Sequence, residues 1–156
     1  MNRLYHYTGC ALPNVYLENG YELVKSPYGE GVTIHEIDRL HAALGAVVVA
    51  NTAPLTGADF RFLRQELGLS QAALGDLVGK DEQAVARWEK GKGKKVDATA
   101  DRLLRLIYQD ATLGKKKFAP MIEFLRKLES TPAEPKRFVG REVGSLWSAT
   151  ALAATG

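Results

Sequence analysis

The stretch that decides the fold is residues 69–91, Leu69-Ser-Gln-Ala-Ala-Leu-Gly-Asp-Leu-Val-Gly79-Lys-Asp-Glu-Gln-Ala-Val-Ala-Arg-Trp-Glu-Lys-Gly91. Apolar residues recur at helical spacing on both sides of Gly79, which predicts two short helices joined by a tight turn. The two helices share a small core made of Leu74, Val78, Val85 and Trp88. We expect Gly75 to lie where steeply crossing helices require a minimal side chain.

With that core inside, Gln83 and Arg87 project from the outer face of the second helix, because residues four apart share one side. This arrangement is a helix-turn-helix, the unit that places its second helix in the DNA major groove. The alternative for Gln83 and Arg87 is that they are ordinary solvated surface residues. Glu89 is expected to face away from DNA and to steady the loop that follows.

The charge distribution also favours nucleic acid. The net charge of +3 and the pI of about 9.0 are weak evidence alone. Positive residues, however, gather directly after the second helix: Arg87, Lys90, Lys92, Lys94 and Lys95. Beside a helix-turn-helix, we interpret them as contacts to the phosphate backbone. A second run, Lys115–Lys117, is interpreted as a solvated face.

Length and composition are those of an ordinary globular protein. A chain of 156 residues with 46% hydrophobic and 25% charged residues can form one good core, or one domain with an appendage. Cys10 is the only cysteine, so no internal disulfide can form and a reducing compartment is expected. Because the sequence has no membrane-length apolar run and no secretory signal, we expect a cytoplasmic protein.

The segments before residue 54 predict a β-hairpin followed by a helix. Residues 14–18 and 21–25 flank Asn19-Gly20, a strong hairpin signal, and residues 27–31 close this unit. The helix is expected to open with a capping box at Thr33–Glu36 and to end between Gly45 and Asn51. Pro54 marks a boundary.

Further helices are expected after Thr56, Ser70 and Asp97 as caps, and from Pro120. Residues 131–135 predict a linker, the segments around residues 138 and 146 a late hairpin, and residues 149–156 a frayed tail. The predicted fold class is mainly α: a five-helix Xre/Cro-type domain with a small amino-terminal β-hairpin and helix module. We expect three parts: this module at 1–53, the DNA-binding domain at 54–130, and a carboxy-terminal extension at 131–156.

The chain resembles the Xre/Cro-type helix-turn-helix family, which contains phage repressors. The residues that carry the resemblance are Phe60-Arg-Phe-Leu-Arg64, Leu69-Ser-Gln71, Leu74, Gly79, Val85 and Arg87-Trp-Glu-Lys-Gly91. The resemblance implies that Gln71 contacts a phosphate and that Glu82, Gln83 and Arg87 contact base edges. Their chemistry agrees, since Gln pairs with adenine, Arg pairs with guanine, and Glu accepts from the cytosine amino group.

The expected DNA-binding set is Ser70, Gln71, Lys80, Asp81, Glu82, Gln83, Arg87, Lys90, Lys92 and Lys94. Two departures from the family stand out in it. Lys80 occupies a turn position that is usually apolar, and Asp81 with Glu82 places negative charge at the start of the second helix. That charge suits the helix dipole but repels phosphate.

Residues 5–110 also look like the MqsA-type antitoxins and their YgiT-like relatives, which join a zinc-ribbon toxin-binding domain to this kind of DNA-binding domain. Such a ribbon needs two cysteine pairs, whereas Cys10 stands alone and His6, His35 and His41 lack ligand spacing. We therefore expect Cys10 to be a small buried residue, and we expect no zinc and no cofactor. His35 and His41 are expected at a helix surface or an interface. No catalytic motif is present, which argues against an enzyme.

Two functions follow. The first is a transcriptional regulator that binds double-stranded DNA as a homodimer on a palindromic operator. Its dimerisation element would be the helices beyond Asp97, whose apolar residues Leu103, Ile107, Ile122 and Leu125 could equally complete the monomer core. The second is an antitoxin that masks a toxin protein and autoregulates its operon, with docking through an exposed strand edge or Tyr16 and Tyr21.

Overall fold

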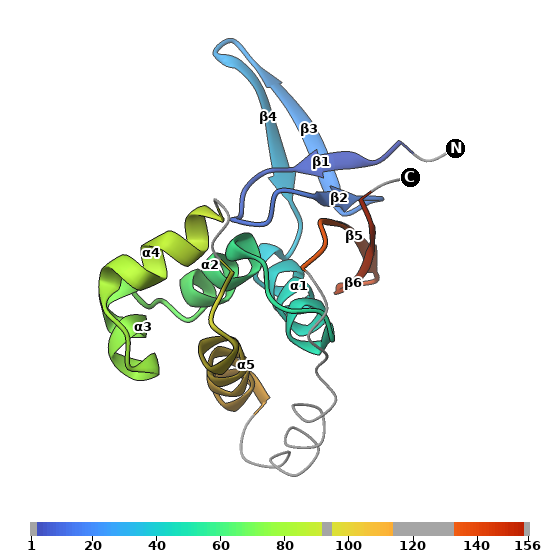
Figure 1. Cartoon of the computed structure of the whole chain (residues 1–156). Helices are drawn as coiled ribbons and strands as arrows, with labels where there is room; N and C mark the ends of the chain where they lie inside the picture. The colour runs from blue at the N-terminus through green and yellow to red at the C-terminus, as the bar shows by residue number, and fades with distance from the viewer. Residues whose placement is uncertain (1–2, 92–94, 114–132, 155–156) are drawn as a thin grey trace. The chain divides into compact units, whose positions relative to one another are not determined.

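The computed structural model describes residues 3–91, 95–113 and 133–154. The chain forms two compact units, one from residues 1–47 and 136–156 and the other from residues 48–135 (Figure 1). Strands occupy 26% of the described chain and form two sheets, so the expected mainly α class holds only for the helix-turn-helix part. The division into domains at residues 53 and 130 stays a prediction.

The first unit is built on a four-stranded sheet in the order β1-β2-β5-β6. Its strands are β1 (Tyr5–Tyr7), β2 (Val15–Leu17), β5 (Lys136–Val143) and β6 (Leu146–Ala153). β2 runs antiparallel to β1 and parallel to β5, with Val15 opposite Phe138. β5 and β6 form an antiparallel hairpin in which Val143 faces Leu146. The predicted late hairpin is thus confirmed, but the predicted frayed tail is wrong, because residues 149–153 pair with β5.

The predicted hairpin at Asn19-Gly20 is wrong. β2 and β3 (Tyr21–Ser26) belong to different sheets, and β3 pairs with β4 (Gly29–Ile34) instead. Gly20 has a φ of +78°, as an Asn-Gly turn predicts, but the turn joins two sheets. The side chain of Asn19 accepts from the Glu142 N–H at 2.5 Å and donates to its carbonyl at 3.1 Å. A long-range contact therefore replaces the local pairing.

The predicted capping box at Thr33 and Glu36 is also wrong. Thr33 lies in β4 opposite Glu22, and α1 (Ile37–Ala50) begins only after a turn in which Glu36 has a φ of +46°. Pairing with Glu22 of β3 engages the backbone of Thr33 in the sheet, so this residue is not at the start of the helix. The end of α1 at Ala50 lies within the predicted range, despite Gly45 and three consecutive valines.

α1 supplies buried side chains to the core of the first unit. Leu40 and Leu44 are fully buried. A Cβ added to Gly140 would lie 3.0 Å from Leu40 Cδ1 and 2.8 Å from Leu17 Cδ2, so this glycine permits close packing on β5. The Trp147 indole N–H donates to the carbonyl of His35 at 2.6 Å, which ties β6 to the start of α1.

The second unit holds α2 (Gly57–Glu66), α3 (Gln71–Val78), α4 (Glu82–Lys90) and α5 (Ala98–Leu113). The predicted caps are confirmed: Thr56 forms a capping box with Asp59, Ser70 accepts from the Ala73 N–H, and Asp97 accepts from the Ala100 N–H. The predicted helix from Pro120 lies outside the described residues. Within the part of the chain that the structure describes, no helix is long and apolar enough to cross a membrane.

A buried ion pair fixes α5 to the segment that precedes α2. Arg105 is fully buried and donates from Nε to Asp101 Oδ1 at 2.6 Å. Its terminal nitrogens donate to three main-chain carbonyls, those of Val49, Asn51 and Ala53. Asp101 Oδ2 accepts the N–H of Leu55 at 2.8 Å. Because the charges and their remaining hydrogen-bonding groups are satisfied, the pair can be buried.

The apolar residues of α5 are buried to different degrees. Leu104 and Tyr108 are buried, while Leu103 and Ile107 are half-buried. Burial, with a smaller contribution from the Glu66 carboxylate, raises the pKa of the Tyr108 hydroxyl. The other two apolar residues expected at a dimer contact, Ile122 and Leu125, lie outside the described residues.

Candidate nucleic-acid interface

The turn between α3 and α4 is held by local hydrogen bonds. α3 ends at Gly79 in the left-handed conformation, with φ +71°, and the Lys80 N–H donates to the carbonyl of Gly75 at 2.9 Å. Asp81 then caps α4 by accepting from the Ala84 N–H at 2.8 Å. A Cβ on Gly75 would lie 2.6 Å from the Lys80 carbonyl oxygen. Gly75 is needed, as predicted, but the close neighbour is the turn backbone.

The inner face of α4 packs on the rest of the unit. Val85 and Leu74 are fully buried, and both belong to the core predicted from the sequence. The Trp88 ring meets Phe60 of α2 edge to face, with centroids 5.6 Å apart. Trp88 and Val78 are half-buried. These contacts fix which face of α4 points outward.

A buried carboxylate anchors the last turn of α4. The Glu89 side chain is 4% exposed and receives two hydrogen bonds of 2.8 Å from Arg64, one from Nε and one from a terminal nitrogen. Arg64 also donates to the carbonyl of Leu69 at 2.9 Å. This bidentate geometry is the strong form of an ion pair. Glu89 is structural, as expected, but it joins α4 to α2 and the α2–α3 loop.

Gln71 belongs to the same cluster. Its amide nitrogen donates to Glu89 Oε1 at 3.4 Å, and the residue is half-buried in the first turn of α3. An amide nitrogen carries two hydrogens, so one is still available to a phosphate oxygen. The hydrogen bond to Glu89 therefore fixes the orientation of the Gln71 side chain.

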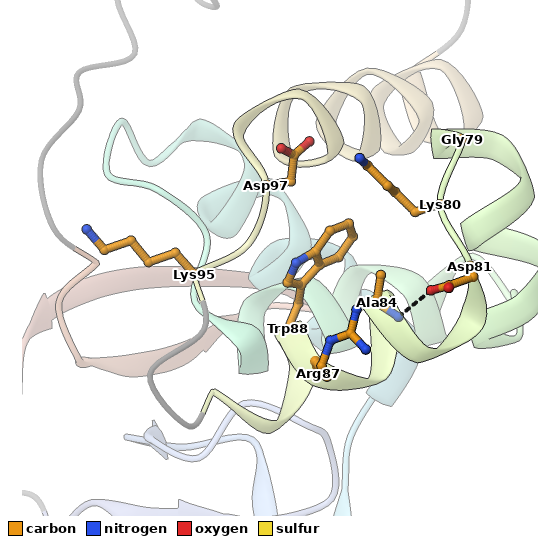
Figure 2. Close-up of a pocket in the computed structure, with 8 residues that line it drawn as sticks. All are labelled: Gly79, Lys80, Asp81, Ala84, Arg87, Trp88, Lys95 and Asp97. Carbon is orange, nitrogen blue, oxygen red and sulfur yellow. Dashed lines mark hydrogen bonds between the residues drawn. The ribbon is translucent and has the colours of Figure 1, made fainter.

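A depression of about 510 Å³ lies between the α3–α4 turn, α4 and the residues just before α5. Figure 2 shows the eight side chains and backbone segments that line it, gathered around the indole of Trp88: Gly79, Lys80, Asp81, Ala84, Arg87, Trp88, Lys95 and Asp97. Three of these residues are cationic and two are anionic. Asp81 and Asp97 each use one carboxylate oxygen to cap a helix.

The cations of this depression are available for a ligand. Lys80 and Arg87 are exposed, and neither side chain makes a hydrogen bond or ion pair with another described residue. By contrast, Arg64 and Arg105 are buried and fully engaged within the unit. The depression therefore brings exposed positive side chains together beside a helix of groove-binding size.

The structure brings the expected DNA-binding residues together only in part. Lys80, Asp81 and Arg87 line the depression, whereas Glu82, Gln83 and Lys90 are exposed on α4 outside its lining. Ser70 is exposed at the start of α3 and Gln71 is half-buried beside Glu89. Lys92 and Lys94 lie outside the described residues.

The sequence does not reveal the residues that support α4 from its inner side. In the sequence Arg64 stands out only as part of the family pattern, because a basic residue on a helix normally indicates a solvated position. The role of Gly57 was missed as well: a Cβ there would lie 2.9 Å from the Glu89 carbonyl oxygen and closer still to that of Trp88. The first turn of α2 thus touches the last carbonyls of α4, which the spacing of α2 alone does not reveal.

The histidines and Cys10 form no group suited to a metal. Among the described residues, no cluster of three or more His, Cys, Asp or Glu side chains is placed to hold an ion. His41 Nε2 is 2.7 Å from the Tyr7 hydroxyl, and His35 lies 3.3 Å from Glu142 and 3.6 Å from Glu22. Cys10 is half-buried, so the expectation of a buried residue holds only in part.

Comparison with known proteins agrees with this geometry. Residues 60–107 match the family model described as Helix-turn-helix, which extends from α2 into α5. Neither a search of curated proteins nor a search of solved structures found a match. The family match together with the capped turn and the outward α4 supports a DNA-binding transcriptional regulator. Residues 60–107 are therefore similar to the helix-turn-helix family, which supports the resemblance to Xre-type regulators.

Proposed function

We propose that this chain is a sequence-specific transcriptional regulator that binds a palindromic operator as a homodimer, with α4 in the major groove. The observation that carries the proposal is the exposed pair Gln83 and Arg87, one helical turn apart on a helix whose opposite side is fixed by Trp88 and Glu89. A rigid backing holds base-contacting side chains in one orientation, which sequence discrimination requires.

The residues of the interface have separate roles in this proposal. Glu82, Gln83 and Arg87 contact base edges through their carboxylate, amide and guanidinium groups, respectively. The phosphate contacts come from Ser70 and Gln71 at the start of α3, and from the lysines Lys80, Lys90, Lys92 and Lys94. Asp81 caps α4 and sets its angle of entry. The carboxylate of Glu82 beside phosphates reduces general DNA affinity, so base contacts contribute a larger share of specific binding.

A second copy is required because one helix-turn-helix grips only a few base pairs. Two units on one face of the duplex, about one helical turn apart, give affinity and specificity together. A palindromic operator is the matching DNA symmetry. No enzymatic step is part of the proposal.

The test begins with selection of bound sequences from random duplexes, followed by footprinting. Arg87→Ala is expected to cost about 1–3 kcal/mol on the selected site and to relax preference at one base pair per half-site. Arg87→Lys keeps the charge but not the bidentate geometry, so it should fail to restore that preference. Lys90→Ala should weaken all sequences alike and make the salt dependence shallower by about one counterion.

The assignment of base contact fails if Arg87→Ala lowers binding to selected and random duplexes by the same factor. The same result for Arg87→Lys as for wild type would also contradict it, because charge alone would then suffice. Arg61→Ala is the control for a lost surface arginine, since Arg61 is exposed on α2.

An antitoxin role is the second candidate, favoured by one feature of the first unit. The β3–β4 hairpin exposes apolar side chains: Leu23 is 69% exposed and Tyr28, at the turn, is fully exposed. Tyr16 and Tyr21 suit docking less well, because each is half-buried against another ring. In this role the chain masks a toxin and autoregulates its operon. Co-purification of a small basic protein encoded beside this gene, lost on Leu23→Lys, is the expected sign.

A further inference from the structure

β6 is a long strand with one free edge. It ends the sheet order β1-β2-β5-β6, and among the described strands only β5 pairs with it (Figure 1). Its eight residues form a complete antiparallel ladder with β5. In such a ladder every second residue of the outer strand directs its N–H and C=O away from the partner. The edge therefore presents a row of backbone groups able to pair with another strand.

This edge lacks the features that normally prevent pairing. Residues 146–153, Leu-Trp-Ser-Ala-Thr-Ala-Leu-Ala, contain no charged residue and no proline. The other edge of the same sheet, β1, has only three residues. β3 and β4 carry Glu22, Lys25 and Glu30. Short strands and charges are the usual protection of sheet edges, and β6 is the long described strand without either.

The exposed face of β6 is symmetric about Ala149, whereas on the other face Trp147 corresponds to the smaller Ala151. Read outward from Ala149 in both directions, the residues are Ser148 and Thr150, then Trp147 and Ala151, then Leu146 and Leu152. When two identical strands pair antiparallel about a two-fold axis through Ala149, each of these couples becomes a directly opposite cross-strand pair. We propose that β6 pairs in this register with β6 of a second copy of this chain, which joins two four-stranded sheets into one.

The register places matching chemistry across the axis. Leu146 and Leu152 are 67% and 47% exposed, and each would lie opposite the other, twice per dimer. Ser148 and Thr150 are exposed on the same face and would form hydroxyl pairs. Aliphatic and hydroxyl pairs stabilise neighbouring strands, whereas like charges opposite each other destabilise them. A charged residue at position 149 would lie on the two-fold axis and face its own copy. The uncharged strand avoids that repulsion.

A second copy explains the symmetry of the strand better than a different partner does, because a foreign strand needs no palindrome. The inference rests on the proposed function in one respect, since the operator complex requires two copies. The pairing itself is a property of the free protein and is measured without DNA.

Disulfide trapping tests the register on the full chain. Ala149→Cys places two thiols opposite each other, at the Cα separation of about 5.5 Å that suits a disulfide. Ala151→Cys is the matched control: it has the same residue type, the same face and the same half-buried state, yet its two copies lie about 13 Å apart along the strands. Oxidation should give several-fold more covalent dimer for Ala149→Cys than for Ala151→Cys or for wild type, in which only Cys10 can react.

A charge pair tests the interaction without oxidation. Ser148→Lys/Thr150→Lys puts lysine opposite lysine twice, whereas Ser148→Lys/Thr150→Glu puts lysine opposite glutamate twice. Both positions are exposed, and β6 keeps its ladder with β5. Sedimentation velocity should show a dimer for wild type and for the Lys/Glu variant. The dissociation constant of the Lys/Lys dimer should be at least tenfold higher.

Three results would overturn the proposal: a monomeric wild type at high concentration, a dimer of equal strength in both charge variants, or equal trapping at positions 149 and 151. The proposed function fails separately. If the Ala149→Cys dimer is trapped but protects no DNA sequence, the proposed regulator function is refuted and the β6 pairing stands. A specific footprint from a protein that does not pair through β6 would do the reverse.

Discussion

Removing Arg64, which packs behind α4, should destabilise the protein far more than removing the exposed Arg61. Arg64→Ala deletes two hydrogen bonds of 2.8 Å to the Glu89 carboxylate, whose side chain is 4% exposed, and a third to the Leu69 carbonyl. An uncompensated buried charge costs about 3–5 kcal/mol. Arg61→Ala is the matched control, because Arg61 is 56% exposed and its Nε lies 4.0 Å from the same carboxylate. An exposed pair of this kind contributes about 0–1 kcal/mol.

Urea unfolding followed by circular dichroism at the helix band measures both free energies. For a slope of about 2 kcal/mol per molar urea, Arg64→Ala should lower the midpoint by roughly 2 M. Arg61→Ala should lower it by less than about 0.5 M on the same scale. The double variant Arg64→Met/Glu89→Met removes both charges and should recover more than half of the loss.

The reasoning is refuted if Arg64→Ala and Arg61→Ala cost the same, because burial would then have no effect on the pair. It is also refuted if the double variant is as unstable as Arg64→Ala. In that case the loss comes from the volume of the arginine side chain, and the charge of Glu89 is unimportant.

Three other substitutions probe the same unit by different physical effects. Gly57→Ala forces a methyl group against the carbonyl oxygen of Trp88, so it should cost about 1–3 kcal/mol in urea unfolding. Arg105→Met leaves a buried carboxylate unpaired and should cost about 3–5 kcal/mol, measured in the same way. Burial and the Glu66 carboxylate raise the pKa of Tyr108, so wild type should lose unfolding free energy as the pH rises above the ordinary tyrosine value of 10.0. Tyr108→Phe should remove that part of the loss, seen as a smaller slope of unfolding free energy against pH, and an unchanged slope would contradict the assignment.

The helix-turn-helix could be predicted from the sequence because its determinants are local. Ser70 and Asp81 cap the helices they precede, Gly79 takes the left-handed conformation, and Val85 is buried at the expected spacing. Each of these features depends on residues within one or two turns. The outward position of Arg87 follows directly from them.

The first unit could not be predicted in the same way, because its pairing is set by distant residues. Asn19-Gly20 is a strong hairpin signal, yet Asn19 bonds to Glu142 and β2 pairs with β5. Thr33 suits a helix cap, yet it lies in β4. Residues 149–153 are uncharged and mostly small, which is typical of a tail, and they form a strand only because β5 lies beside them. Burial of Arg64 was likewise invisible, because its partner Glu89 lies 25 residues away.

The parallel pairing of β2 with β5 has a consequence for the order in which the chain acquires structure during synthesis. The backbone partner of the Asn19 side chain, Glu142, lies 123 residues further along the chain. The β1-β2-β5-β6 sheet therefore cannot form while the second unit is still being synthesised. Residues 48–113 belong to a unit formed by one continuous stretch of chain, so they can assemble first. Until β5 has been synthesised, the backbone N–H and C=O groups on the β5 side of β2 lack their partner strand. The rate of translation over the last segment sets how long they stay unpaired.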